Sequence, residues 1–266
     1  MTTPPTPLTP WPYPRWIAHR GAGKLAPENT LAAFRVGAAH GYRAFECDVK
    51  LSADGVPFLL HDSTLERTTS GHGDAGDRSW NELSQLDAGD WHSRSFAGEP
   101  LLRLEAVARF CIRNGFALNL EIKPTPGDEL RTGRVVALEA ARLWAGQDVP
   151  PLLSSFQAAA LHAARDAVPA LPRALLLDKL PEGWLAQAQA LDCTAVVTNH
   201  AVMDATVLGQ LHAAGLRALV YTVNDAAVVQ RLLGLGATGQ DRIDGIDGII
   251  TDAIDRFAPG GGATPR

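Results

Sequence analysis

Short apolar, β-prone runs alternate with longer helical patterns from one end of the chain to the other, and this alternation limits the fold more than any other feature. Repeated strand–helix units form parallel sheets, because each helix carries the chain back to the start of the next strand. Candidate strands lie at Trp16–His19, Ala44–Lys50, Val56–His61, Ala117–Lys123, Leu152–Ser155, Arg173–Leu177, Ala195–Thr198, Leu216–Val223 and Asp247–Thr251. Candidate helices lie at Thr30–His40, Leu102–Asn114, Leu130–Ala145, Gln157–Ala167, Gly183–Leu191, Asp204–Ala214 and Asp225–Leu233.

The number of candidate strands and the length of the chain together favour one closed barrel. The 266 residues are 46% hydrophobic, enough for one sizeable core and typical of a (β/α)8 TIM barrel. One of the nine candidate strands is surplus to eight barrel positions. Asp54-Gly55 is typical of a two-residue hairpin turn, because both positions accept positive φ angles. Val56–His61 should then run antiparallel to Ala44–Lys50, with Asp48 directly opposite His61.

The periodic pattern fades in three places, which define the domain organisation that we expect. Residues from about 62 to 100 are rich in Gly, Asp, Ser and Trp, which predicts a small subdomain inserted after the second-strand hairpin. Residues 1–14 and 258–266 are predicted to be flexible. The remainder, residues 15–257, is expected to be a single catalytic TIM-barrel domain.

Composition excludes several classes of function. The net charge of −5, the pI near 5.9 and the lack of any Lys/Arg block argue against nucleic-acid binding. No apolar stretch approaches the roughly 20 residues of a membrane span, and the N-terminal residues resemble no secretion signal. The isolated Cys47, Cys111 and Cys193 fit reduced, buried thiols better than disulfides. We therefore expect a cytoplasmic protein without a membrane span.

Two candidate strands carry polar residues on one face only. Side chains alternate along a strand, so one face of each holds the following residues: Glu46, Asp48 and Lys50 on the first, and Asn119, Glu121 and Lys123 on the second. The opposite faces are apolar, as the helix-covered outside of a barrel requires. The polar faces should therefore point into the barrel, near the C-terminal strand ends where barrel enzymes have their active sites.

Three converging carboxylates indicate a metal site. Glu46, Asp48 and Glu121 would repel one another in a partly dry cavity, and a divalent cation would remove that repulsion. Oxygen ligands without cysteine favour Mg²⁺, with Ca²⁺ and Mn²⁺ as alternatives, over zinc. The simpler interpretation is that Lys50 and Lys123 pair with the acids.

Two histidines end β segments and are candidates for proton transfer. His19 ends the first strand and His61 the hairpin arm, and either alone is equally consistent with a structural histidine. Arg20, next to His19, offers a planar fork that matches phosphate oxygens. Together these residues predict a site for phosphate chemistry.

An ordered set of motifs resembles the glycerophosphodiester phosphodiesterase family over about Trp16 to Asp255. The set consists of His19-Arg20-Gly21, Pro27-Glu28-Asn29-Thr30, Glu46-x-Asp48, Asp54-Gly55 followed by His61-Asp62, Glu121-Ile122-Lys123 and Tyr221-Thr222-Val223-Asn224. Within the insertion, Leu65-Glu66-Arg67-Thr68-Thr69, Leu86-Asp87-Ala88-Gly89-Asp90-Trp91 and Phe96-x-Gly98-Glu99 are also similar to that family, and the bacterial cytoplasmic members look most similar overall.

The resemblance implies roles for individual residues. It implies metal ligands at Glu46, Asp48 and Glu121, acid/base roles for His19 and His61, and hydrolysis of glycerophosphodiesters to sn-glycerol 3-phosphate and an alcohol. Many members have Trp at the position of Tyr221, where the side chain is thought to pack on the glycerol moiety, so we expect Tyr221 to contact the substrate.

The resulting hypothesis is that the metal and Arg20, with Lys123, hold the phosphate of a small glycerophosphodiester while one histidine removes a proton and the other donates one. The nucleophile would be the glycerol 2-hydroxyl or water. Three alternatives are a lysophospholipase D acting on lysolipids, a phosphoester-binding barrel without catalytic activity, and an unrelated metal-dependent barrel acting on sugars.

Overall fold

The computed structural model describes residues 8, 10–235, 245–257 and 259, and within them one sheet closes into a barrel. In this part of the chain nine strands follow the order β1-β9-β8-β7-β6-β5-β4-β2-β3, and an additional pairing of β1 with β2 closes the ring. The strands are β1 (Trp16–Ala18), β2 (Ala44–Leu51), β3 (Pro57–Leu59), β4 (Ala117–Ile122), β5 (Leu152–Ser155), β6 (Arg173–Leu177), β7 (Ala195–Asn199), β8 (Arg217–Tyr221) and β9 (Gly248–Thr251). Only β3 pairs antiparallel, with β2, so the predicted (β/α)8 TIM barrel with a hairpin arm is confirmed.

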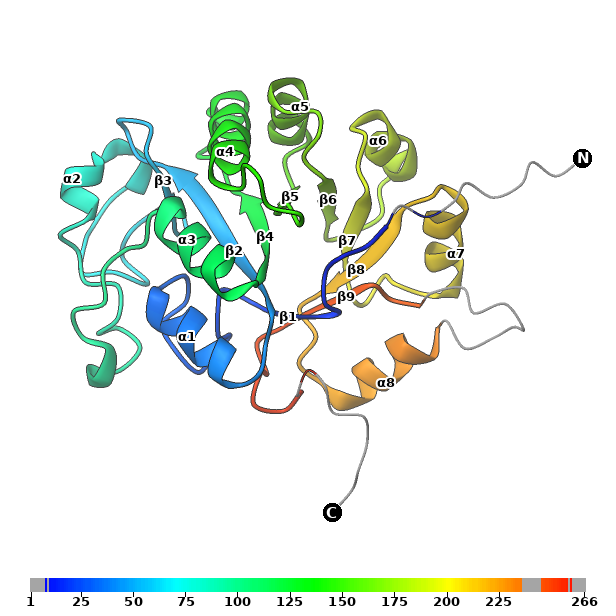
Figure 1. Cartoon of the computed structure of the whole chain (residues 1–266), viewed down its shortest axis with the longest axis horizontal. Coiled ribbons are helices and arrows are strands. Elements are labelled where there is room, and N and C mark those ends of the chain that lie inside the picture. Colours follow the sequence, from blue (N-terminus) through cyan, green and yellow to red (C-terminus); the bar gives the residue numbers. More distant parts are fainter. Residues whose placement is uncertain (1–7, 9, 236–244, 258, 260–266) are drawn as a thin grey trace, which may run out of the picture.

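Helices cover the outside of the barrel, as Figure 1 shows. They are α1 (Leu31–Ala39), α3 (Leu104–Asn114), α4 (Glu129–Leu143), α5 (Ala158–Ala167), α6 (Trp184–Ala190), α7 (Ala205–Ala213) and α8 (Ala226–Gly234), whereas the short α2 (Trp80–Leu83) lies at the flank, away from the barrel. Local sequence sets their ends. The Thr30 hydroxyl accepts a hydrogen bond from the Ala33 amide and caps α1, and Gly115, at φ 64°, ends α3.

The strand faces divide as the alternation of polar and apolar residues predicts. All eight residues of β2 are buried, with Phe45, Cys47 and Val49 in the outer core that the helices cover. The lower part of the barrel interior is filled by a separate apolar cluster: Ile17, Ala44, Leu152, Ala174, Leu176, Ala195, Val197, Leu219 and Ile250. Along β2 and β4 the polar residues follow Ala44 and Ala117, so they lie nearer the C-terminal strand ends than Ala44 of this layer.

The hairpin register differs from the prediction by one residue. Val49 pairs with Leu59 and Lys50 with Phe58, and the Leu60 amide donates to the Asp48 carbonyl at 3.1 Å. Asp48 therefore lies opposite Leu60, and the prediction that it faces His61 is wrong. The cause is the turn, because the connection has three residues, with Gly55 at φ 81° and its amide bonded to the Ser52 carbonyl.

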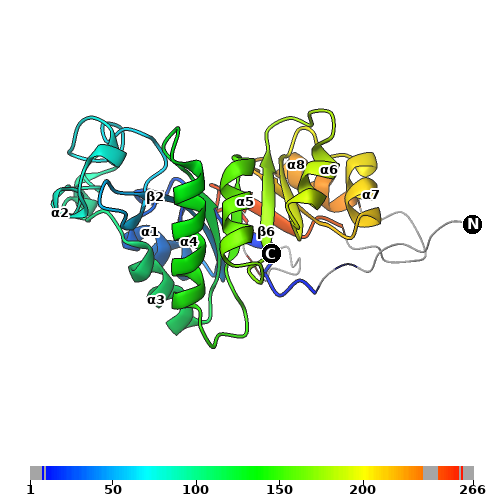
Figure 2. The ribbon, with the colours of Figure 1, turned by 90° about the horizontal axis from the view of Figure 1, so that it is seen from above.

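The predicted insertion is a small unit whose apolar core is shared with the chain on either side of it. Residues 62–100 include the 3₁₀ helices η1 (Ala75–Asp77) and η2 (Arg94–Phe96) as well as α2. The core of this unit consists of Phe58, Leu60, Leu65, Ala75, Leu83, Ala88 and Leu101. In both views the unit lies at one flank of the molecule, beside the β2–β3 hairpin and α1 (Figures 1 and 2). It is therefore placed next to the strands that carry the polar residues.

Most of the two segments predicted to be flexible lies outside the described residues. Of residues 1–14, Trp11 and Tyr13 pack against the apolar cluster at the bottom of the barrel, and the Tyr13 hydroxyl donates to the Pro150 carbonyl at 3.0 Å. The division into residues 1–14, 15–257 and 258–266 stays a proposal. Among the described residues, no helix has the length and apolar character needed to cross a membrane.

Candidate active site

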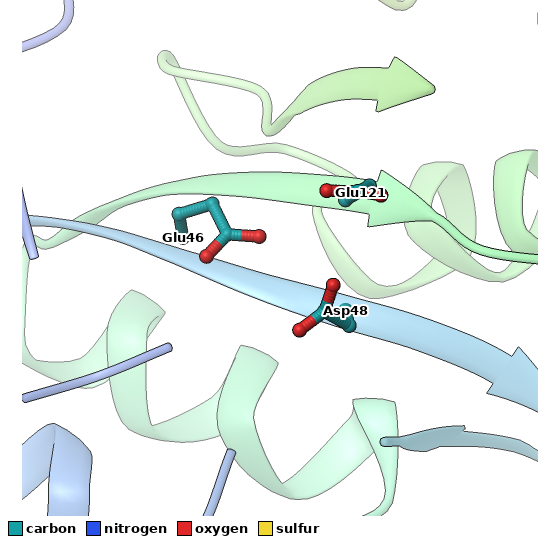
Figure 3. Close-up of side chains that lie close together, drawn as sticks. All are labelled: Glu46, Asp48 and Glu121. Atoms are coloured by element: carbon teal, nitrogen blue, oxygen red, sulfur yellow. The ribbon is translucent and has the colours of Figure 1, made fainter. Parts of the chain in front are cut away.

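Three carboxylates converge inside the barrel between β2 and β4. Glu46 and Asp48 come from β2, and Glu121 of β4 is the direct neighbour of Asp48 in the strand register. One ligand oxygen from each lies within 4.8 Å of the others, and Figure 3 shows the three groups pointing toward one another. The sequence-predicted cluster is therefore brought together by the fold.

The electrostatics of this cluster fit a cation site. Burial and the charge of Asp48 raise the pKa of both Glu46 and Glu121. Burial would also raise the pKa of Asp48, but Arg20 and Lys123 hold it well below its usual range. Glu46 Oε1 is buried and has no hydrogen-bond partner among the described residues. An unpartnered buried carboxylate oxygen beside two further acids is the environment that a hard divalent cation requires, so these residues can hold one.

The two lysines behave differently. Lys123 Nζ lies 3.0 Å from Glu121 Oε1 and 3.3 Å from Asp48 Oδ1, so it pairs with the acids as the simpler interpretation expected. Lys50 Nζ instead donates to the Lys123 carbonyl at 3.2 Å. Burial and the charge of Lys123 lower the pKa of Lys50 to about 8. Neither lysine pairs with Glu46, whose Oε2 accepts from the Arg20 amide at 3.0 Å and lies 3.8 Å from His19 Nε2.

Asn29 positions Asp48. Its Nδ2 donates to Asp48 Oδ2 at 2.9 Å, and its Oδ1 accepts from the Asp48 amide at 3.2 Å. Asn29 adopts φ 61°, a left-handed conformation that asparagine tolerates better than most residues. The next residue, Thr30, caps α1, so neighbouring residues hold the metal-site carboxylate and start the helix.

Each candidate catalytic histidine is held at Nδ1 by an aspartate. His19 Nδ1 lies 2.6 Å from Asp252 Oδ1, and His61 Nδ1 lies 2.6 Å from Asp62 Oδ1. Asp252 in turn accepts from Asn224 Nδ2 at 3.0 Å. This arrangement leaves Nε2 of each ring as the atom that can exchange a proton with a substrate.

The pKa values of the two histidines are shifted in opposite directions. Burial alone would lower the pKa of His19, but the hydrogen bond with Asp252 and the charge of Glu46 outweigh it, and the net pKa is raised. Burial lowers the pKa of His61, and the nearby positive charge of Arg20 adds to this against the opposing charge of Asp48. Opposite shifts of this kind suit an acid and a base.

Arg67 of the insertion connects the two sides of the site. Its guanidinium donates to both oxygens of Glu28 at 2.8 Å, and to both oxygens of Asp62 at 2.6 and 2.9 Å. Glu28 also accepts from Arg20 Nη1 at 2.9 Å. The network therefore runs from Arg20 to His61 through one arginine of the inserted unit.

A cavity of about 170 Å³, the central cavity, brings the predicted residues to one space. Its polar side carries His19, Arg20, Glu46, His61, Asn119, Glu121 and Lys123. Its opposite side is formed by Phe156, Leu176, Tyr221 and Ile250, with the Tyr221 ring edge-on to Phe156 at 5.7 Å. The cavity thus has one charged and one largely apolar wall.

Several side chains that organise this site have no predicted role in the sequence analysis. Asp62 and Arg67 occur in the quoted motifs and Asp252 does not, and the contacts of Asp252 with His19 and of Arg67 with Glu28 join parts of the chain distant in sequence. Phe156 directly follows β5, between Ser155 and Gln157, and a single aromatic residue at that place carries no specific signal. A parallel strand end is the one local signal that would have suggested Asp252, which directly follows β9.

Comparison with known proteins gives a consistent result. The family model described as "Glycerophosphoryl diester phosphodiesterase family" matches residues 19–256. A glycerophosphodiester phosphodiesterase of Caldanaerobacter subterraneus is 31% identical over 237 residues, covering 89% of this chain and 93% of the relative.

Solved structures agree with the sequence matches. A phosphodiesterase of Oleispira antarctica in complex with the product sn-glycerol-3-phosphate is similar with a TM-score of 0.82 and 32% identity, over 92% of this chain and 95% of that one. A glycerophosphodiester phosphodiesterase of Agrobacterium tumefaciens gives a TM-score of 0.73 at 28% identity, over 92% and 99% of the two chains.

Proposed function

The chain belongs to the glycerophosphoryl diester phosphodiesterase family and is a glycerophosphodiester phosphodiesterase, and from that premise we propose that its substrates are small water-soluble diesters. Glycerophosphocholine and glycerophosphoethanolamine are representative, with sn-glycerol 3-phosphate and the free alcohol as products. The observation that carries this proposal is the convergence of two histidines and two of the three clustered carboxylates on one cavity of about 170 Å³.

Glu46, Asp48 and Glu121 are proposed to hold one divalent cation, with Mg²⁺ preferred and Ca²⁺ or Mn²⁺ as alternatives. The support is the unpartnered Glu46 Oε1 and the raised pKa of Glu46 and Glu121. When bound, the cation would neutralise negative charge on the non-bridging phosphate oxygens.

Arg20 and Lys123 are proposed to hold the phosphate against the carboxylates. Both line the central cavity and both lie 3.3 Å from Asp48, Arg20 through Nε and Lys123 through Nζ. Arg20 Nε is buried without a well-aligned hydrogen-bond acceptor in the described part of the chain. Its guanidinium is kept in place by Glu28, so it can orient the phosphate without rearranging.

Two proton transfers complete the proposed reaction. His61, kept neutral by its lowered pKa, accepts the proton of the attacking hydroxyl through Nε2 as the new P–O bond forms. His19, with the raised pKa, donates its Nε2 proton to the oxygen of the departing alcohol as that P–O bond breaks. Asp62 and Asp252 hold the two rings at Nδ1 throughout.

The attacking hydroxyl is either the glycerol 2-hydroxyl, which gives a cyclic phosphate that water then opens, or water itself. Tyr221 and Phe156 are proposed to pack against the glycerol carbons from the apolar wall of the cavity. Trapping of a glycerol cyclic phosphate in a rapid-quench experiment separates the two routes.

Product analysis with glycerophosphocholine, glycerophosphoethanolamine and a lysophospholipid tests the proposed function. Release of glycerol 3-phosphate from glycerophosphocholine, absent in both His19→Ala and His61→Ala, is the expected result. Cleavage of a lysophospholipid alone would assign the chain to the lysophospholipase D class instead. Binding of the diesters without turnover would leave a phosphoester-binding barrel.

A cytoplasmic location is also proposed. Cys47, Cys111 and Cys193 are buried free thiols, a state that a reducing compartment maintains. Recovery of the protein with cytoplasmic markers in cell fractionation is the expected outcome, and recovery with envelope markers would contradict it.

A further inference from the structure

Asn119 of β4 is a buried polar side chain to which the proposed reaction assigns no role. It is 4% exposed, and its Oδ1 is buried without a hydrogen-bond partner in the described part of the chain. The side chain nevertheless lines the central cavity. A buried amide oxygen is costly when it is left unpaired. An unpaired carboxamide in the wall of a substrate cavity therefore points to a ligand group that completes its hydrogen bonds.

The strand register places Asn119 deeper in the barrel than the groups proposed to hold the cation and the phosphate. Along the chain it precedes Glu121 by two residues and Lys123 by four, and the C-terminal strand ends form the mouth of the barrel. At about 3.3 Å per residue, Asn119 lies roughly 7 Å below Glu121. Its register partner on β5, Leu152, belongs to the apolar cluster of the lower interior. Asn119 is therefore at the inner end of the polar wall.

The shape of the barrel decides which arm of the diester points inward. The inner end is closed by the apolar cluster, so it can take only an arm of fixed, small size. The glycerol moiety is such an arm, whereas head groups differ in size and need the open mouth. With the phosphate at Arg20 and Lys123, a three-carbon chain extends inward along Tyr221 and carries its terminal hydroxyl to the level of Asn119.

A free hydroxyl is the group that fits this position. The oxygen of a carboxamide accepts a hydrogen bond and its nitrogen donates one, and a hydroxyl can do both, so either end of the Asn119 side chain can pair with it. An acyl chain on the same oxygen would have no room. The next space below Asn119 is a cavity of about 10 Å³, lined otherwise by apolar and aromatic side chains, which is about the size of one water molecule.

We propose that Asn119 is a specificity-determining residue that binds the free terminal hydroxyl of the glycerol moiety. It thereby selects fully deacylated glycerophosphodiesters over 1-acyl lysophospholipids, in which the same oxygen carries an acyl chain. This inference rests on the proposed function. It adds the residue that recognises the glycerol end of the substrate and the physical reason why a lysolipid is rejected.

Steady-state kinetics with three diesters that differ only at the terminal carbon tests the proposal. They are glycerophosphocholine, its 1-deoxy analogue and its 1-O-methyl ether, and all three keep the 2-hydroxyl and the phosphocholine group. The wild type should cleave both analogues with a kcat/KM about 10- to 100-fold below that of glycerophosphocholine, because they leave a buried polar group unpaired. Asn119→Leu should lower kcat/KM for glycerophosphocholine by a similar factor and cleave the 1-deoxy analogue at least as well as the wild type does.

The matched control is Asn81→Leu, which makes the same change at an exposed asparagine outside the central cavity and should keep the wild-type preference. Asn119→Ala is a second variant in which the preference should be lost, and thermal unfolding verifies that each variant is folded.

Two results would overturn the role of Asn119 and leave the proposed function intact. One is equal cleavage of glycerophosphocholine and its 1-deoxy analogue by the wild type, and the other is an unchanged preference in the Asn119 variants. Failure of the wild type to cleave either glycerophosphocholine or glycerophosphoethanolamine would instead reject the proposed function itself, and this inference with it.

Discussion

The side of the barrel formed by β1, β2 and β4 and the side formed by β6, β7 and β8 share one strand geometry but contribute different properties to the central cavity. The first side presents charged groups, exemplified by Glu46, Glu121 and Lys123. The second presents mainly apolar side chains such as Leu176 and Tyr221. One side thus supplies the groups for chemistry, and the other supplies shape and excludes water.

The two sides also differ in how many hydrogen bonds and ion pairs are needed to hold their side chains in place. Buried charges are costly unless each is paired, and on the first side Asn29, Glu28 and Arg67 hold the ionised groups in place. The inserted unit that provides Arg67 lies on this flank (Figure 2). The apolar side has fewer charged groups to hold, although Asn199 donates to Asp178 at 2.9 Å, and it carries no such insertion among the described residues. The comparison suggests that the insertion serves to organise the charged side.

The largest effect should follow from removing either histidine on the charged side. His19→Ala and His61→Ala should each lower kcat by about 10²- to 10⁴-fold, the usual contribution of general acid–base catalysis. Both side chains are partly exposed, so thermal unfolding should change little. Near-normal turnover in either variant, measured with glycerophosphocholine, would reject the two-histidine scheme.

The next effect concerns stability without metal. The pKa of Glu46 in the folded chain is raised to about 8 by burial and the charge of Asp48, against about 4.3 in an unfolded chain. The folded state therefore binds this proton more tightly, and stability should fall as pH rises from about 4 to about 8. Glu46→Gln should flatten that fall in chelated protein followed by thermal unfolding.

Glu182→Gln, at an exposed position, is the matched control and should leave the pH dependence of chelated protein unchanged. If the melting temperature of Glu46→Gln depends on pH as that of the wild type does, the pKa of Glu46 is not raised in the folded chain, which would contradict the account.

Removal of Arg67, which links the insertion to the active site, should have an intermediate effect on kcat. Arg67→Ala removes the shared partner of Glu28 and Asp62, so Arg20 and His61 lose their fixed positions. We expect kcat to fall about 10- to 100-fold with a smaller change in KM, since misplacing catalytic groups is costly.

Arg67→Lys should recover little of this activity, because a lysine cannot make the paired hydrogen bonds of a guanidinium. Arg78→Ala, at an insertion arginine whose ion pair with Glu82 is exposed, controls for general effects on the unit. An altered pH–rate profile in Arg67→Ala alone would distinguish a positioning role from a structural one.

The smallest effect should come from the apolar side. Phe156→Ala removes an exposed part of the cavity wall and should raise KM only a few-fold, with kcat little changed. Leu130→Ala, at an exposed apolar residue outside the cavity, is the control. A loss as large as that in the histidine variants would show that the division between the two sides is wrong.

The residues of the charged side were largely predictable from the sequence, because the alternation of polar and apolar residues within a single strand identifies them. Alternation along two strands identified Glu46, Asp48 and Glu121 as residues facing the interior, and the strand register places them together as expected. The same reasoning failed for the hairpin, where one extra turn residue moved the pairing by one position. His61 still lines the central cavity, one residue beyond the Leu60 amide that bonds to Asp48.

The supporting network was not predictable in the same way. The contact of Asp252 with His19 spans 233 residues, and that of Arg67 with Glu28 spans 39. Such pairs depend on barrel closure and on how the inserted unit docks, neither of which has a periodic signature. Asn29 shows a further limit, since the sequence placed it in a family motif without a role, whereas its side chain holds Asp48.

The central claim is that catalysis depends on a divalent cation held by the acidic cluster of the charged side. The most direct test measures glycerol 3-phosphate release from glycerophosphocholine by chelator-stripped protein, with Mg²⁺, Mn²⁺ or Ca²⁺ added back, in parallel for the wild type and Glu46→Gln. The account predicts turnover that requires added cation in the wild type and is not restored by any cation in the variant. Full activity of the stripped wild type, or equal reactivation of Glu46→Gln, would contradict it.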